Sequence, residues 1–279
     1  MTDITIGAEK RFYRPGDVVR GLVQVDLPHA QKIGGVELDA QGLERTEITV
    51  NYGKHSVTYI SQNLMHKYNV LLHGPGMLEA GRHEFPFEFE LPRGALPTYH
   101  GTYACITYTI KANLDIPLWF DAHRKVEYYV LPRADTVSIN MRSVRLESRD
   151  AHDLSKPGFI MDLERATWTA DETITGVLQV TSTGGKRLRK ADIKLQSLEW
   201  AVAEGTARDI AMDVVQCYIS GAALSDGSRV PFGIKVPRTI YSTYKGIYSR
   251  LGWALTVNLD IAWGFDTQAS QGLILVNPA

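Results

Sequence analysis

The chain has 279 residues, of which 44% are hydrophobic and 22% charged, and its formal net charge is −1. This composition is typical of a globular protein and excludes a chain that stays disordered through high charge and low hydrophobicity. A net charge this close to zero provides no global positive field for nucleic acid, so we expect no nucleic-acid partner, although local basic patches remain open.

The chain carries no recognisable targeting segment and few cysteines. Residues 1–17 lack the apolar core of a signal peptide, and no window approaches the roughly 18–20 apolar residues of a membrane-spanning helix. The two cysteines are Cys105 and Cys217, and no Asn-x-Ser/Thr sequon occurs. We therefore expect a cytoplasmic protein with free, buried thiols, while a single disulfide and peripheral contact with membranes stay open.

The first part of the chain predicts strands joined by tight turns. Residues 4–25 predict two strands around a turn at residues 15–17, because polar and apolar side chains alternate along the second strand. Residues 33–50 predict a further pair of strands, with the break near Gly42. A similar strand–turn–strand pattern recurs at residues 159–180.

Residues 51–74 have the least clear pattern of the chain. We expect a turn at residues 52–54 and a strand at residues 57–60. Residues 64–72 suit either a strand or a short helix, and we expect a strand. Glycine and proline then predict a loop at residues 73–76.

A long stretch of the chain occurs twice. Residues 85–122 align with residues 230–267 without a gap, and 14 of the 38 aligned positions are identical. Many of these positions are turn residues or aromatics, which makes chance a poor explanation. The offset of 230 − 85 = 145 residues predicts two similar domains, since solenoid repeats have periods of about 20–50 residues.

The first copy predicts the end of the first domain and the linker that follows it. Residues 102–116 predict a long strand and residues 125–131 a last one. Pro86, in the preceding strand, favours an edge or a bulge because proline has no backbone N–H to donate. The polar residues 132–158 form the expected linker, with one strand inside it at residues 137–146.

The fold expected from these features is all-β. No stretch of ten or more residues has clear helical periodicity, and short strands separated by Gly/Pro turns are typical of β-sandwiches. We expect two tandem antiparallel β-sandwich domains of the immunoglobulin-like kind, at residues 1–134 and 135–279.

The second domain contains the only dense basic run. Gly184 and Gly185 predict a tight hairpin between strands at residues 175–181 and 190–202, which places the run at the hairpin tip. The cations can hold a phosphate, an acidic peptide or a lipid headgroup. The alternative is a solvated turn that discourages edge pairing. The candidate binding residues in this run are Lys186, Arg187, Arg189 and Lys190.

Two apolar turns are further candidates for contact with a partner. Leu118 and Trp119 lie beside the turn of the first copy, and Trp263 lies beside the matching turn of the second. Exposed aromatic side chains at such turns would anchor a partner. Packing under the turn, or between the two domains, is the alternative that we favour.

Several segments resemble the arrestin family, especially the α-arrestins. Residues 80–92, AGRHEFPFEFELP, resemble the family pattern aG-x-h-x-Fp-F-x-f-x-LP, and residues 96–117 fit the pattern that follows it. Residues 15–21, PGDVVRG, resemble an early turn of the family. The region from Gly227 onward is similar to the carboxy-terminal arrestin domain and to the arrestin-fold subunit of retromer. The resemblance implies two β-sandwiches of arrestin type.

The chain also departs from the family pattern. It has no Pro-Pro-x-Tyr motif for WW domains, since residues 96–99, Leu-Pro-Thr-Tyr, lack the first proline. We expect no tail after the second domain, and therefore no partner for the charged cluster that holds such a tail in receptor arrestins. We therefore carry over none of its residues, and whether phosphate regulates the chain stays open.

No set of residues predicts catalysis. The motifs G-x-S-x-G, H-E-x-x-H, the P-loop and G-x-G-x-x-G are absent, and the histidines lack metal-site spacing. Asp115 and Asp121 recur as Asp260 and Asp266. Acid–base work by paired carboxylates is one interpretation, but recurrence at equivalent turns favours hydrogen bonds to the backbone. We expect no enzyme activity, no cofactor and no metal.

The function that these observations favour is a non-enzymatic adaptor or scaffold. Its expected partners, implied by the resemblance, are membrane-protein tails or trafficking machinery in cargo, receptor or transport processes. A self-assembling structural protein is the first alternative, because sheet faces and edges can pair with copies of themselves. A hydrolase or sugar-binding sandwich is the second. The sequence leaves the oligomeric state open.

Overall fold

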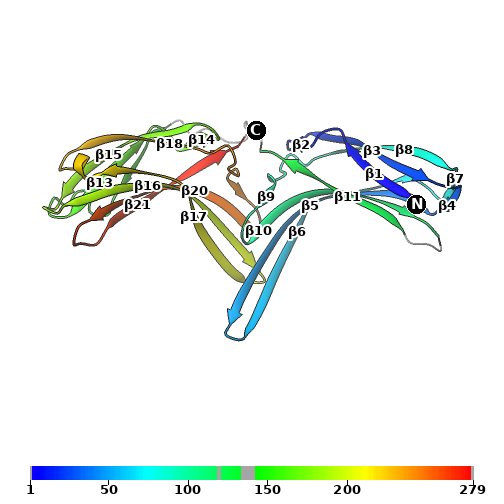
Figure 1. Cartoon of the computed structure of the whole chain (residues 1–279), viewed down its shortest axis with the longest axis horizontal. Helices are drawn as coiled ribbons and strands as arrows, with labels where there is room; N and C mark the ends of the chain where they lie inside the picture. The colour runs from blue at the N-terminus through cyan, green and yellow to red at the C-terminus, as the bar shows by residue number, and fades with distance from the viewer. Residues whose placement is uncertain (1, 118–120, 133–141, 278–279) are drawn as a thin grey trace. The chain divides into compact units, whose positions relative to one another are not determined.

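The computed structural model describes residues 2–117, 121–132 and 142–277 (Figure 1). Nearly all of the regular structure in these residues is β-strand, and the one helical element is a 3-10 turn, η2 (Gly221–Ala223). The predicted all-β fold is confirmed, and the segment at residues 64–72 lies in a strand rather than a helix.

The chain divides into two compact units. The first consists of Met1–Arg133 with the short segments Ala201–Ala207 and Gly246–Ser249, and the second of the remaining residues. The expected boundary at residues 134/135 lies outside the described residues and stays a proposal.

The first unit contains two main sheets. The smaller has the order β1 (Asp3–Ala8), β3 (Val18–Leu27), β8 (Gly81–Glu90). The larger has the order β2 (Phe12–Tyr13), β11 (Ala122–Val130), β10 (Ala104–Asp115), β5 (Gly35–Tyr52), β6 (His55–His73), with β9 (Tyr99–His100) paired to β10. A small separate pair is formed by β4 (Gln31–Ile33) and β7 (Gly76–Leu78).

Aromatic rings fill the space between the two sheets of the first unit. Phe89 of β8 stacks on His66 and Tyr68 of β6, with ring centroids 5.8 and 5.2 Å apart. Its ring centroid also lies 6.3 Å from that of Tyr128 of β11. Because these contacts join strands of opposite sheets, they form the core of a β-sandwich.

The expected break near Gly42 is wrong. Strand β5 continues from Gly35 to Tyr52, and its register with β6 shifts between Gly42 and Leu43. A Cβ on Gly42 would lie 2.6 Å from the ring of Tyr108 on β10. The glycine therefore makes room for a ring in the core instead of ending the strand.

A buried carboxylate, Glu44, lies farther along β5 in the same unit. It accepts hydrogen bonds from the backbone N–H groups of Ile247, Tyr248 and Ser249, at 3.1, 3.0 and 2.8 Å. The hydroxyl of Ser249 and the amide of Asn63 also donate to it. These donors offset the cost of removing the carboxylate from water.

The second unit also contains two main sheets. The smaller has the order β12 (Val144–Glu147), β13 (Pro157–Leu163), β15 (Thr173–Thr183), β18 (Arg229–Lys235). The larger has the order β14 (Thr167–Thr169), β21 (Thr267–Val276), β20 (Ser249–Ile261), β16 (Leu188–Ala203), β17 (Thr206–Ser220), with β19 (Tyr244–Lys245) paired to β20.

The strand orders of the two units correspond element by element. The order β1-β3-β8 matches β13-β15-β18, and β2-β11-β10-β5-β6 matches β14-β21-β20-β16-β17. In both units the pairing between the first two strands of the larger sheet is parallel, whereas the other described pairings are antiparallel. The predicted strand in the linker is β12, which begins at Val144; residues 137–141 lie outside the described residues.

The hairpin predicted at Gly184 and Gly185 is wrong. Strand β15 belongs to the smaller sheet and β16 to the larger, so the two glycines carry the chain from one sheet to the other. Both have positive φ, 58° and 71°. A Cβ on Gly184 would also lie 2.9 Å from backbone atoms of Ser155 and Lys156. Glycine suits such a crossing because it tolerates both constraints.

Both cysteines are free thiols, as predicted. Cys105 and Cys217 are half-buried rather than fully buried. Burial raises the pKa of each thiol, which keeps both in the unreactive protonated form at neutral pH.

Candidate binding surface at one end of the second unit

Three loops of the second unit meet beside the basic run. They are the connection between β15 and β16, the segment that follows β17, and the turn between β20 and β21. The first two loops line an open pocket of about 690 Å³, and Lys186, Arg187, Arg189 and Asp226 are among its lining residues. We call Lys186–Lys190 the basic segment and residues 262–266 the aromatic turn.

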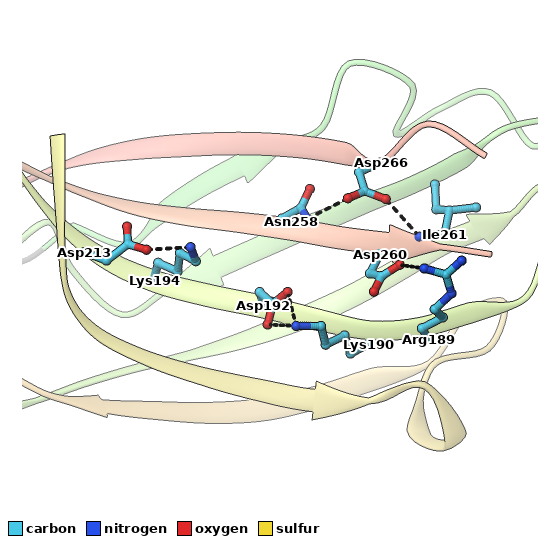
Figure 2. Close-up of polar contacts among 9 residues, drawn as sticks. All are labelled: Arg189, Lys190, Asp192, Lys194, Asp213, Asn258, Asp260, Ile261 and Asp266. Atoms are coloured by element: carbon cyan, nitrogen blue, oxygen red, sulfur yellow. Dashed lines mark hydrogen bonds and ion pairs between the residues drawn. The ribbon is translucent and has the colours of Figure 1, made fainter. Parts of the chain in front are cut away.

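Two cations of the basic segment are already paired with acids of the larger sheet (Figure 2). Arg189 donates a hydrogen bond from Nη1 to Asp260 at 3.0 Å. Lys190 donates from Nζ to Asp192 at 2.8 Å, and this bond raises the pKa of the lysine. The two cations are 56% and 45% exposed, so the pairs add little stability, but each cation has its charge compensated within the chain.

The other two cations of the segment point to solvent without a partner. Lys186 and Arg187 are exposed, and neither side chain has an ion pair or hydrogen bond among the described residues. Asp226, an acid that lines the same pocket, accepts a hydrogen bond from the backbone N–H of Thr183 at 2.6 Å. The charge available to an outside anion is therefore that of Lys186 and Arg187.

The aromatic turn presents two bare rings. Trp263 and Phe265 are 98% and 97% exposed, the largest values among the exposed large hydrophobic residues of the described chain. Core packing, the alternative favoured from the sequence, is wrong for Trp263. Phe265 belongs to the same apolar turn, and its match to Phe120 in the repeat gives no signal of exposure. Leu118 and Trp119, the other predicted anchors, lie outside the described residues.

The aromatic turn is tied to the basic segment and to its own base. The backbone N–H of Ala262 donates to the carbonyl of Arg187 at 2.9 Å. Asp266 accepts from the backbone N–H of Ile261 and from the side-chain amide of Asn258, both at 3.1 Å (Figure 2). The structure therefore brings Trp263 next to the basic segment, which the sequence did not predict.

Two of the four recurring aspartates make the backbone hydrogen bonds that we expected at turns. Asp121 accepts from the backbone N–H of Ile116 at 3.4 Å, as Asp266 does from Ile261. Asp260 instead pairs with Arg189, so its expected backbone role is wrong. Neither repeated pair lines the pocket beside the basic segment.

Residues 2–117, 121–132 and 142–277 contain neither a cluster suited to a metal ion nor a helix suited to a membrane. In those ranges, no group of three or more His, Cys, Asp or Glu side chains is placed to hold a metal ion. His66 instead packs on Phe89, and burial lowers its pKa. Over the same part of the chain, no helix has the length and apolar character required to cross a bilayer.

The amino-terminal half of the chain matches a known family. Residues 2–137 match the family described as Arrestin (or S-antigen), N-terminal domain. This half of the chain is arrestin-like. The fold predicted from the resemblance is thereby confirmed, since the arrestin-like chain also has two units of paired β-sheets.

Curated relatives of this arrestin-like protein are distant. Arrestin domain-containing protein 17 of Caenorhabditis elegans is 27% identical over 53% of this chain and 39% of its own length. Arrestin domain-containing protein 1 of Mus musculus is 24% identical over 50% and 31%. Thioredoxin-interacting protein of Rattus norvegicus is 26% identical over 50% and 36%. The matches thus cover less than two-fifths of each relative's length.

Proposed function

We propose that this arrestin-like chain is a non-enzymatic adaptor that binds protein partners, such as membrane-protein tails or trafficking machinery, while touching the membrane surface. Membership of the arrestin-like family supports a general adaptor role. The specific partners and the membrane contact are proposals that rest on the surfaces described above.

We infer the membrane contact from two exposed aromatic rings that lie beside cations without acidic partners. Trp263 and Phe265 are almost completely exposed, and the basic segment, with Lys186 and Arg187, is bonded to the same turn. Aromatic rings are favoured at the boundary between lipid and water, and each Lys or Arg near an anionic bilayer contributes about 1 kcal/mol. Together these groups match an anionic lipid surface.

Edge strands support the binding of protein partners, although on β6 the backbone N–H of Ile60 already donates to Glu204. Strands β6 and β17 each form one end of the larger sheet of a unit. Strand β17 also exposes Met212, Val214 and Tyr218, at 41%, 39% and 74%. An edge strand of this kind offers backbone donors and acceptors to an added peptide strand, and side chains along it to select the peptide.

Two measurements test the proposal. Co-sedimentation of the whole chain should show binding to phosphatidylcholine vesicles that contain phosphatidylserine, and weak binding to vesicles of phosphatidylcholine alone. Equal binding to both, or to neither, would refute the membrane contact. Proximity labelling in cells should enrich membrane proteins or trafficking components over an unrelated protein of the same size. The absence of such enrichment would contradict the adaptor role.

Self-assembly remains the alternative function, because the same free edges could pair between copies. Light scattering over a range of protein concentrations separates the two. We expect a constant monomer mass for an adaptor, whereas a mass that grows with concentration would favour assembly.

A further inference from the structure

Strand β6 has a long edge with few charges of its own. It ends the larger sheet of the first unit, and no described strand lies beside its outer edge. Residues 55–66 contain no Asp, Glu, Lys or Arg and neither Pro nor Gly, and residues 57–60 are all β-branched or aromatic. Ile60 and Leu64 are exposed on this edge strand. Such a stretch favours pairing with a strand of another chain.

Other long edge strands are protected by their own charged residues. Strand β17 contains Arg208, Asp209 and Asp213, and β8 contains Glu84 and Glu88. Charged side chains on an edge discourage pairing, because an added strand would have to remove them from water. Residues 55–66 therefore depend on a different form of protection.

A turn from a distant part of the chain covers this edge. Glu204 and Gly205 connect β16 to β17, and both belong to the first unit. The carboxylate of Glu204 accepts a hydrogen bond from the backbone N–H of Ile60 at 3.2 Å. The backbone N–H of Glu204 donates in return to the hydroxyl of Ser61 at 3.0 Å. The turn is thus bonded to two successive residues of β6.

Glutamate is an unusual residue at this position. The φ angles of Glu204 and Gly205 are 47° and 81°, and the only other described residues besides glycine with positive φ are Asp171 and Trp263. Two-residue turns with positive φ at both positions favour Asn, Asp or Gly at the first. Non-glycine residues in this conformation are strained and concentrate at functional sites. The turn alone does not require glutamate, which indicates a role for its longer side chain.

The hydrogen bond to Glu204 uses a backbone group that an added strand would need. In an antiparallel pair, every second residue directs its N–H and C=O away from the partner strand. Ile60, which lies opposite Glu47 of β5, is such a residue, because its N–H reaches Glu204. A strand added to this edge would place a carbonyl at the same N–H. Glu204 and the added strand therefore compete.

We propose that Glu204 is a latch that prevents β6 from pairing with β6 of a second copy of this chain. A second copy fits the edge because two identical strands can pair antiparallel about a twofold axis. Residues 55–66 bring no like charges together in such a pair, and Ile60 supplies an apolar contact. Displacement of Glu204 would open the edge for assembly. Neither the membrane contact nor a protein partner is needed for this role.

Two variants separate the carboxylate from the turn. Glu204→Gly suits the positive φ and removes the acceptor, whereas Glu204→Gln keeps an acceptor oxygen on a side chain of the same length. The turn stays anchored in both, because the hydroxyl of Thr46 donates to the carbonyl of Val202 at 2.7 Å.

Hydrogen exchange tests the latch in dilute solution. The Ile60 amide should exchange at least about threefold faster in Glu204→Gly than in the unaltered chain, because its hydrogen bond is lost. In Glu204→Gln the exchange should stay close to that of the unaltered chain. Equal exchange in all three proteins would overturn the latch.

Sedimentation velocity of the whole chain over a range of concentrations tests the pairing of copies. We expect the unaltered chain and Glu204→Gln to stay monomeric, while the mass of Glu204→Gly rises with concentration towards that of a dimer. A monomeric Glu204→Gly would overturn the proposal. Association of the unaltered chain to the same extent as Glu204→Gly would overturn it as well.

A third variant locates the contact on β6. Ile60→Lys adds a charge to the exposed edge, opposite Glu47 of its own sheet. Combined with Glu204→Gly, it should restore the monomer, because pairing would bring lysines of two copies together. Continued association of this double variant would place the contact elsewhere and refute the assignment to β6.

Discussion

Arg189 donates a hydrogen bond to Asp260 at 3.0 Å, and this pair divides the basic segment into two kinds of cation. Arg189 and Lys190 have acidic partners on the sheet, whereas Lys186 and Arg187 have none among the described residues. The division matters because only a charge that is not already compensated attracts an outside anion with its full strength.

The first prediction concerns this division. Lys186→Ala with Arg187→Ala should weaken binding to anionic vesicles by about 2 kcal/mol, or roughly 30-fold, because each exposed cation contributes about 1 kcal/mol. The matched control is Arg189→Ala with Asp260→Ala, which removes a compensated pair and leaves the net charge unchanged. Co-sedimentation at several salt concentrations measures both. A larger effect of the control would refute the assignment.

The second prediction concerns strain in the aromatic turn. Trp263→Gly should raise the free energy of unfolding by up to about 1 kcal/mol, because glycine adopts positive φ without a steric penalty. Phe265→Gly is the control, since Phe265 is equally exposed but is not among the residues with positive φ. It should lower stability slightly, through the greater freedom of the unfolded chain. Urea unfolding compares them, and a loss of stability in Trp263→Gly would contradict the strain.

The third prediction concerns pH. Burial lowers the pKa of His66, so below the ordinary histidine value of about 6.5 the unfolded chain binds a proton that the folded chain resists. Protonation of His66 in the unfolded chain therefore lowers the free energy of unfolding as pH falls from about 6.5 towards the pKa in the folded chain. His66→Phe keeps a ring against Phe89 and removes the group that binds this proton. Its unfolding free energy should fall less between pH 7 and pH 5.5 than that of the unaltered chain.

A control for the pH measurement is His55→Gln, at an exposed position of the same strand β6. Its pH profile should follow that of the unaltered chain. If His66→Phe also follows that profile, the buried imidazole is not the source of acid sensitivity.

The fourth prediction concerns the space above Gly42. Gly42→Ala should destabilise the first unit by about 1–3 kcal/mol, because its Cβ would overlap the ring of Tyr108. Gly7→Ala on β1 is the matched control, since no atom lies within 4 Å of its Cβ position. Thermal unfolding should show a lower midpoint for the first variant only. Equal midpoints would show that the ring can move aside.

The fifth prediction concerns the carboxylate inside the first unit. Glu44→Ala should lower the free energy of unfolding by about 3 kcal/mol or more, because it leaves the N–H groups of Ile247, Tyr248 and Ser249, which are buried or partly buried, without their acceptor. Glu37→Ala is the control, at an exposed position of the same strand. Chemical unfolding measures both, and similar losses would mean that water replaces the carboxylate.

The local sequence pattern was sufficient to predict the all-β fold and the positions of most strands. Alternation of polar and apolar residues, together with Gly and Pro turns, depends on neighbours in the chain, and it identified the strands on either side of residues 52–54. It failed at Gly42, because the ring of Tyr108 that requires glycine there lies far away in sequence. It failed again at Gly184, because nothing local tells a turn within a sheet from a crossing between sheets.

The binding surface was predictable only in pieces. The sequence indicates the four cations and Trp263, but their arrangement depends on contacts between distant segments. Asp260 lies far along the chain from Arg189, and the carbonyl of Arg187 that binds the aromatic turn has no signature in sequence. Which cations are compensated, and which rings are bare, therefore became visible only in three dimensions.

The parallel pairing of β14 with β21 has a consequence for how the protein is made. The partner of β14, near the beginning of the second unit, is the strand that the ribosome adds last among those described. During synthesis β14 cannot form its backbone hydrogen bonds to β21 until β21 has left the exit tunnel. Such long-range closure slows folding and exposes unpaired edges to aggregation. We expect the nascent chain to depend on chaperones for longer than its size alone would suggest.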